Sequence, residues 1–220
     1  MAKSSRRSFP PAPTHARALL LHAHPRRDSF NQALGAAWAE GARASGLAVE
    51  VVHLADLDFE LRLDDGDEGP LEPDLIDLQA RIADAAHLVI AAPVWWGSVP
   101  AVLKGFIDRT FQFGWAHGKD DKGNPTSGLT GRTGRLVMTM DAPRIWDRFM
   151  YGRSATRQLK DATLWYSGVK PTKVSMFAGI DSTTPARRAA MLESARKAGQ
   201  KDAHALLKRL PAPVKAIAAR

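Results

Sequence analysis

Short apolar runs and helical patterns alternate along most of this chain. Continuous apolar runs, which are typical of buried strands, cover residues 17–21, 49–54, 87–92, 135–140 and 174–178. Apolar residues recur at helical spacing over residues 30–38, 73–86, 99–111, 145–165 and 185–210. A long glycine-bearing connection covers residues 114–134. Strands that alternate with helices predict an α/β fold, with a parallel sheet and helices on both of its faces.

The composition fits one globular α/β domain. The chain has 220 residues, of which 45% are hydrophobic and 25% are charged. No apolar stretch approaches the roughly 18 residues that span a bilayer, so we expect no membrane partner. The absence of cysteine excludes disulfides, cysteine-based zinc sites and thiol catalysis. It also fits a reducing cytoplasm, where we expect the protein to reside.

The two ends of the chain differ from the middle. Residues 5–9, Ser-Arg-Arg-Ser-Phe, resemble the start of a twin-arginine export signal, but the proline-rich residues 10–13 follow where such a signal needs an apolar segment. We therefore expect residues 1–16 to form a disordered basic tail, residues 17–210 to form the single domain, and residues 211–220 to be flexible.

The chain is basic, with a formal net charge of +8. Three of these charges come from Lys3, Arg6 and Arg7 in the tail. A basic balance favours anionic ligands such as phosphorylated cofactors. Nucleic acid is the competing partner, but no basic stripe is interleaved with aromatic residues, so we expect no nucleic-acid binding.

Two adjacent tryptophans stand where a predicted strand ends and a helix begins. They belong to the segment Pro93-Val94-Trp95-Trp96-Gly97-Ser98-Val99-Pro100. Ligands of open α/β sheets bind outside the carboxyl ends of the strands, and two indoles there can form the wall of a pocket for a flat aromatic ligand. The alternative is that one or both tryptophans pack in the core.

A second segment of this kind follows the first predicted strand. It reads His24-Pro25-Arg26-Arg27-Asp28-Ser29-Phe30-Asn31, with a helix starting near Ser29. A helix N-terminus with hydroxyl and amide side chains binds phosphate well, but Ser29 can equally be an ordinary helix cap. His22 and His24 could share one face of a strand, but no third ligand is evident, so we expect no metal.

Together the two segments resemble a known family. Ala23-His24-Pro25-x-x-x-Ser29-Phe30-Asn31 and Pro93-x-Trp95-Trp96-Gly97-x-x-Pro100-Ala101-x-Leu103-Lys104-Gly105-Phe106 are similar to the flavodoxin-like NAD(P)H:quinone oxidoreductases. This family includes the mammalian quinone reductase, the bacterial modulators of drug activity and the ancillary proteins of glutathione-gated potassium efflux systems. The resemblance runs from about Arg17 to about Phe177.

The resemblance implies a doubly wound, five-stranded parallel sheet of order 2-1-3-4-5, in a flavodoxin-like flavin-binding domain. It implies FAD as cofactor, with FMN as second choice, and NAD(P)H as electron donor. It further implies two-electron reduction of quinones by a ping-pong mechanism, in a homodimer with the active site at its interface. An electron carrier of the flavodoxin type and a flavin-bearing regulatory subunit of a transporter are the alternatives.

The resemblance also assigns site residues. It places flavin contacts on three strand ends: His24, Ser29, Phe30 and Asn31; Pro93, Val94, Trp95, Trp96 and Gly97; and Thr139 and Asp141. Asp141 could instead cap the following helix. Trp115 and Trp146 are candidates for the substrate face, with packing as the alternative. The mammalian enzyme has a Gly-Gly pair followed by a catalytic Tyr and His near the third strand end, and no such Tyr–His pair is present here, so no catalytic side chain is assigned.

Overall fold

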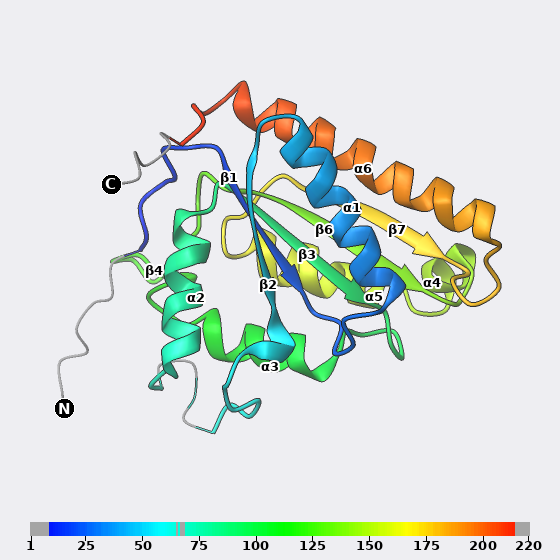
Figure 1. Ribbon diagram of the computed structural model, residues 1–220. Coiled ribbons are helices and arrows are strands. Elements are labelled where there is room, and N and C mark those ends of the chain that lie inside the picture. The colour runs from blue at the N-terminus through cyan, green and yellow to red at the C-terminus, as the bar shows by residue number, and fades with distance from the viewer. Residues whose placement is uncertain (1–8, 65, 67–68, 214–220) are drawn as a thin grey trace.

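The computed structural model describes residues 9–64, 66 and 69–213. Figure 1 shows a twisted parallel sheet between two layers of helices. The five strands lie in the order β2-β1-β3-β6-β7, and every neighbouring pair is parallel. This is the order 2-1-3-4-5 when only the strands of this sheet are counted, so the predicted fold is confirmed.

The strands of the large sheet lie close to the predicted apolar runs. Their bounds are β1 Arg17–His22, β2 Ala48–His53, β3 His87–Pro93, β6 Thr133–Met140 and β7 Thr172–Ala178. The helices are α1 Phe30–Ala44, η1 Leu54–Asp56, α2 Pro73–Asp84, α3 Ala101–Thr110, α4 Arg144–Phe149, α5 Ser154–Arg157, η2 Gln158–Trp165 and α6 Pro185–Leu207.

Each face of the sheet has its own hydrophobic core. Along β1, Leu19 and Leu21 belong to the core under α2, α3 and the α5–η2 segment, whereas Ala18 and Leu20 belong to the core under α1 and α6. This division arises because successive side chains along a strand point to opposite faces of the sheet. Because β3 is buried over its full length, the central strand reads as a continuous apolar run.

The helices α1 and α6 pack side by side on one face, as Figure 1 shows. Two glycines allow this close approach. A Cβ atom on Gly199 would lie 2.0 Å from the carbonyl oxygen of Trp38, and one on Gly41 would lie 2.0 Å from that of Arg196. Both contacts are far below van der Waals distance, so neither position accepts a larger residue without separating the helices.

A buried ionic cluster lies between α6 and the beginnings of the central strands. Asp202 accepts hydrogen bonds from the guanidinium of Arg135 (2.9 Å to Nη2), from Trp38 Nε1 (3.1 Å) and from Lys173 Nζ (3.2 Å). Burial by itself would raise the pKa of this carboxyl, but the hydrogen bond and charge of Arg135, together with nearby His87, hold the pKa far below its usual range. The carboxylate therefore stays ionised inside the fold.

Two segments differ from the prediction. The helix expected over residues 145–165 is interrupted, because Gly152 and Arg153 adopt left-handed backbone angles (φ 58° and 55°) between α4 and α5, and its last part, η2, is a π-helix. The connection over residues 114–134 contains a small antiparallel hairpin, β4 His117–Lys119 and β5 Pro125–Ser127. Strands of three residues are too short to produce a recognisable alternation.

The end segments are more ordered than expected. Residues 9–16, which the sequence placed in a disordered tail, lie against the domain: the carbonyl of Pro11 accepts a hydrogen bond from Arg132 Nη2 at 2.8 Å. Arg132 is buried and needs such acceptors, which is why this segment is held. Ala16 N–H donates to the carbonyl of Pro211 at 2.7 Å, so residue 211 is also anchored. Residues 1–8 and 214–220 of the two predicted terminal segments lie outside the described residues.

None of the helices in the described part of the chain combines the length and apolar character needed to cross a bilayer.

Candidate functional site

Three loops meet at the carboxyl edge of the sheet. They follow β1, β3 and β6, which are neighbours in the sheet, so the loops are brought together by the topology. Backbone hydrogen bonds join the strand ends, from Ala23 N to Ala91 O (2.9 Å) and from Val94 N to Thr139 O (2.7 Å). The rings of His24 and Trp95 meet edge to face, with centroids 5.4 Å apart. The sequence motifs on the first two loops are therefore adjacent in space.

The first loop ends in a capped helix. The Oγ of Ser29 accepts a hydrogen bond from Gln32 N at 3.2 Å, which makes Ser29 the N-cap of α1. Ser29 is therefore a helix cap. The N-terminus of α1 can still bind a phosphate, because other backbone N–H groups of the first turn have no intrahelical partner. Phe30 follows the cap and lies under the guanidinium of Arg188, 4.7 Å from the ring centroid. A cation thus stands close to the start of α1.

Asn31 and Thr139 form a buried link beneath the loops. The Nδ2 of Asn31 donates to the carbonyl of Val137 (3.2 Å) and to Thr139 Oγ1 (3.1 Å), which ties α1 to β6. Among the residues that the structure describes, the buried Oδ1 of Asn31 has no hydrogen-bond partner. A buried acceptor without a donor is costly, so this atom is a candidate to receive a hydrogen bond from a bound ligand.

The two tryptophans lie on a tight turn and point away from the core. Trp95 and Ser98 exchange backbone hydrogen bonds of 3.0 and 2.9 Å, and Trp96 and Gly97 between them have φ values of 53° and 70°. These angles define a type I′ turn, whose first central position favours asparagine, aspartate or glycine. Trp95 is 43% exposed and Trp96 is 97% exposed, so neither packs in the core. A strained, exposed tryptophan is unexpected unless the ring has a use.

The tryptophan turn is fixed from the side by the segment that follows α4. Ser154 Oγ donates to the carbonyl of Gly97, and Ser98 Oγ donates to Gln158 Oε1 at 3.3 Å. A Cβ on Gly97 would lie 3.4 Å from the ring of Tyr151 and 3.2 Å from Ser154 Oγ. The N–H groups of Val94 and Trp95 are already bonded within the protein, which leaves those of Trp96 and Gly97 as the donors that the turn can offer a ligand.

Asp141, on the third loop, organises the next loop along the sheet. Its Oδ1 accepts from Asp181 N (3.0 Å) and its carbonyl accepts from Gly179 N (3.1 Å). The N-cap position of α4 is Pro143, so Asp141 does not cap that helix. Asp141 therefore connects the third loop to the β7–α6 loop.

Trp115 and Trp146, the two tryptophans proposed for the substrate face, differ in their exposure to solvent. Trp115 is only 8% exposed and packs edge to face on Phe111, with centroids 6.1 Å apart, so it has the packing role. Trp146 is half-exposed on α4, together with Ile145 and Phe149, and exposed Met150 follows the end of the helix. Only Trp146 is available to a ligand or to another protein.

A polar cluster that the sequence reasoning missed supports the first loop. His22 and His53 end neighbouring strands in register, and their rings stack with centroids 4.8 Å apart. With its amide nitrogen turned toward the loop, Gln32 donates to the carbonyls of Arg26 (3.0 Å) and Arg27 (2.6 Å) and accepts from His53 Nδ1 (2.7 Å). In the sequence, this cluster could have been found from the histidines at the ends of the first two predicted strands.

His22 should make folding stability sensitive to mild acid. Burial, and to a smaller extent the charge of His53, lower the pKa of His22 from 6.5 to about 4. Protonation is harder in the folded state, so the stabilisation is complete above pH 6.5 and is lost as the pH falls toward 4. We expect His22 to account for a loss of about 3 kcal/mol in the free energy of unfolding across this range.

The measurement is urea unfolding at several pH values for the native chain and for His22→Asn. The variant is expected to be less stable at pH 7 but to change less between pH 7 and pH 4. Parallel pH profiles for the two proteins would show that His22 is not the titrating group.

Comparisons with known proteins agree with this fold. A family model described as a flavodoxin-like fold matches residues 16–201. The chain is 25% identical over 197 residues to an uncharacterized NAD(P)H oxidoreductase of Haemophilus influenzae, covering 86% of this chain and 97% of that protein. It is 25% identical over 173 residues to a ribosyldihydronicotinamide dehydrogenase-like protein of Penicillium crustosum, covering 66% of this chain and 64% of that protein. It thus spans somewhat less than two thirds of the fungal relative.

Two solved structures have the same fold. An NAD(P)H:quinone oxidoreductase from Methanothermobacter marburgensis aligns with a TM-score of 0.74 at 24% identity, over 84% of this chain and 98% of that one. An FMN-dependent NADH-azoreductase from Bacillus anthracis, solved in complex with FMN, aligns with a TM-score of 0.65 at 16% identity, over 87% and 99% of the two chains.

Proposed function

This chain belongs to the flavodoxin-like fold family, and from that premise we propose that it is a flavin-dependent NAD(P)H oxidoreductase that reduces quinones or similar acceptors by two electrons. The observation that carries the proposal is the exposed tryptophan pair at the carboxyl edge of the sheet, in which Trp96 is held in a strained backbone conformation. The oxidoreductase relative in Haemophilus influenzae, which the chain matches over nearly its whole length, supports the same reaction class.

The loops suit a flavin in three respects. The start of α1, with Arg188 close by, can hold a phosphate. Asn31 has a free buried acceptor for a hydroxyl of the ligand, and the Trp96 and Gly97 N–H groups can donate to the polar edge of its ring system. When bound, a flavin supplies hydride acceptance and hydride release at its ring. FAD is our first choice from the resemblance of the loops, and the FMN complex of the Bacillus anthracis relative supports FMN as the second.

The chain's own groups position the reactants and exclude water. Trp95 and Trp96 offer flat apolar surface against which the ring system of a flavin, and beside it a nicotinamide or a quinone, can stack. If donor and acceptor use this one slot in turn, the order of reaction is ping-pong. The N–H donors at Trp96 and Gly97 are fixed by the turn, so they can stabilise developing negative charge without rearranging. Because NAD(P)H is an intracellular donor and the chain has no cysteine, we place the activity in the cytoplasm.

A second copy of the chain is the proposed partner. Trp96 and the residues of α4 and its end expose large apolar side chains near the turn: Ile145, Trp146, Phe149, Met150 and Tyr151. Apolar groups concentrated in this way mark an interaction surface. A homodimer through this surface would cover the apolar side chains and enclose the open side of the tryptophan slot, and sedimentation at micromolar concentration would detect it.

The first test is the visible absorption spectrum of the purified protein, with the released chromophore identified by chromatography. A yellow protein carrying one flavin per chain is expected, and it should oxidise NADPH or NADH when menadione is present. A colourless protein that takes up neither FAD nor FMN would refute the flavin proposal. A flavin-loaded protein that oxidises neither donor with any quinone would refute the enzymatic one, and an electron carrier or a regulatory flavoprotein would then remain.

A further inference from the structure

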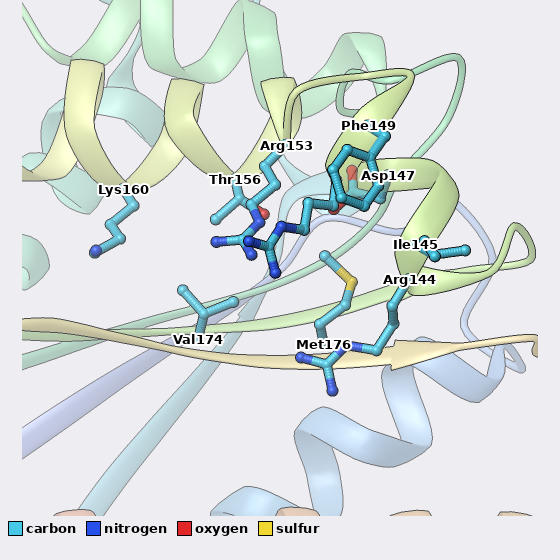
Figure 2. A pocket seen from close by; sticks show the side chains of 10 residues that line it. Arg144, Ile145, Asp147, Phe149, Arg153, Thr156, Lys160, Val174 and Met176 are labelled. Atoms are coloured by element: carbon cyan, nitrogen blue, oxygen red, sulfur yellow. The ribbon is translucent and has the colours of Figure 1, made fainter.

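A cleft separate from the three strand-end loops lies between α4, the start of η2 and the outer strand β7. It has a volume of about 500 Å³. Figure 2 shows Val174 and Met176 rising from β7 as its apolar floor, with Arg153 and Lys160 directed toward them from the helical segment above. None of the residues that the flavin proposal assigns to the strand-end loops lines this cleft.

The cleft is strongly cationic. Arg144, Arg148, Arg153 and Lys160 line it, and Asp147 is the one acidic residue among the lining side chains. Burial raises the pKa of Asp147, an effect that the charges of Arg153 and Arg144 oppose. Four positive groups therefore face a single carboxyl.

Few carboxylates pair with these cations, and Arg148 lies over the ring of Phe149, 5.4 Å from its centroid. Among the described residues, the three arginines form no ion pair with a carboxylate, and the ion-pair neighbour of Lys160 is Asp161 at 3.9 Å. Other arginines of the chain do pair, as Arg81 does with Glu50 (2.7 Å) and Arg109 with Glu72 (3.0 Å). Several unpaired cations around one cavity repel each other, and this repulsion is relieved when an anion binds.

We propose that this cleft binds a nucleoside phosphate, that is, a planar organic body carrying two or more phosphate charges. Arginine recognises phosphate oxygens in bidentate fashion, which accounts for the guanidinium groups. Val174 and Met176 offer apolar surface that a bare inorganic anion would leave unused. The volume lies in the range of small-molecule sites, which is about 300–1,000 Å³.

The cleft is coupled structurally to the tryptophan turn. Arg153 immediately precedes Ser154, whose hydroxyl donates to the carbonyl of Gly97. The nucleoside phosphate bound in the cleft can have two sources. It can be the phosphorylated adenosine end of the NAD(P)H donor, or a free nucleotide that acts as an effector. The first source rests on the proposed oxidoreductase function, and the second does not.

The test is isothermal titration of the full chain, as purified, with 2′,5′-ADP at low ionic strength. Saturable binding of one ligand per chain is expected, and it should weaken at least about tenfold in the double variant Arg148→Gln/Lys160→Gln. The matched control is Lys119→Gln/Lys122→Gln, which removes two exposed positive charges from the β4–β5 hairpin and should bind like the native chain. Flavin content is measured on all three proteins and should be equal.

No saturable binding by the native chain, or equal binding by the double variant, would overturn the proposal. Steady-state kinetics distinguish the two sources of the nucleoside phosphate. If 2′,5′-ADP competes with NADPH, and the double variant raises KM for NADPH while kcat is unchanged, the donor's phosphorylated end occupies the cleft. If 2′,5′-ADP binds without competing, the cleft is an effector site. The binding result holds even if the chain proves to be colourless and inactive, so the two proposals fail independently.

Discussion

Trp96→Gly is expected to stabilise the fold and to weaken flavin binding. Trp96 has a φ of 53°, a backbone conformation that costs a large L-residue about 1–3 kcal/mol and costs glycine almost nothing. Because its ring is 97% exposed, little packing is lost, and the free energy of unfolding should rise by about 1 kcal/mol. Loss of a stacking ring should lower flavin affinity by about tenfold to a hundredfold, as for bases stacked on aromatic side chains.

Two titrations measure these opposite effects. Urea unfolding of the flavin-free protein gives the stability change, and quenching of flavin fluorescence gives the dissociation constant. Trp165→Ala is the matched control, since Trp165 is also an exposed tryptophan, at 57%, but lies on η2 and contacts Lys170. The control should bind flavin like the native chain. Unchanged flavin affinity in Trp96→Gly would remove Trp96 from the site, whatever happens to stability.

The tryptophan turn also shows what could be predicted from sequence. The end of a buried strand, a glycine and a following helix are local signals, so the position of the loops followed from residues 87–111 alone. The parallel sheet followed from the alternation of strands and helices, and its strand order came from the family resemblance. The conformation of Trp96 could not be predicted, because tryptophan disfavours the left-handed region and only the surrounding contacts hold it there.

Features that depend on distant pairs escaped the sequence reasoning. Ser29 looked like a helix cap or a phosphate ligand, and its local bond to Gln32 was foreseeable. The link from Asn31 to Thr139, however, joins residues 108 positions apart, and no spacing rule reaches so far. The cationic cleft was missed for a related reason: the helix predicted as continuous over residues 145–165 is broken at Gly152, and the break turns Arg153 toward β7.

Of the substitutions considered, Asp202→Asn in the buried ionic cluster is expected to cause the largest loss of stability. Asp202→Asn would leave the guanidinium of Arg135 buried without a counter-charge, and breaking a buried pair in this way costs about 3–5 kcal/mol. For a chain of this size the melting temperature should fall by about 10 °C. Glu193→Gln is the control on the same helix: that carboxylate is exposed and paired with Arg196 at 2.7 Å, and its loss should leave the melting temperature unchanged.

The pH dependence separates charge pairing from lost packing. The pKa of Asp202 in the folded state lies below its ordinary value of 3.8, so its contribution is complete above that value and declines as the pH falls below it. The stability gap between the native chain and Asp202→Asn should therefore be constant from pH 8 to about pH 5 and should narrow below about pH 4. The His22 contribution is common to both proteins and cancels in the difference.

A double variant tests whether Arg135 and Asp202 stabilise the fold as a pair. In Asp202→Asn/Arg135→Gln the buried guanidinium that lost its counter-charge is removed as well, so part of the lost stability should return relative to Asp202→Asn alone. If the double variant is instead less stable than the single one by the full cost of removing Arg135, then Arg135 stabilises the fold through its other bond, to Ser175 Oγ at 2.7 Å, and not through Asp202. A stability gap that does not narrow in acid would lead to the same conclusion by a separate route.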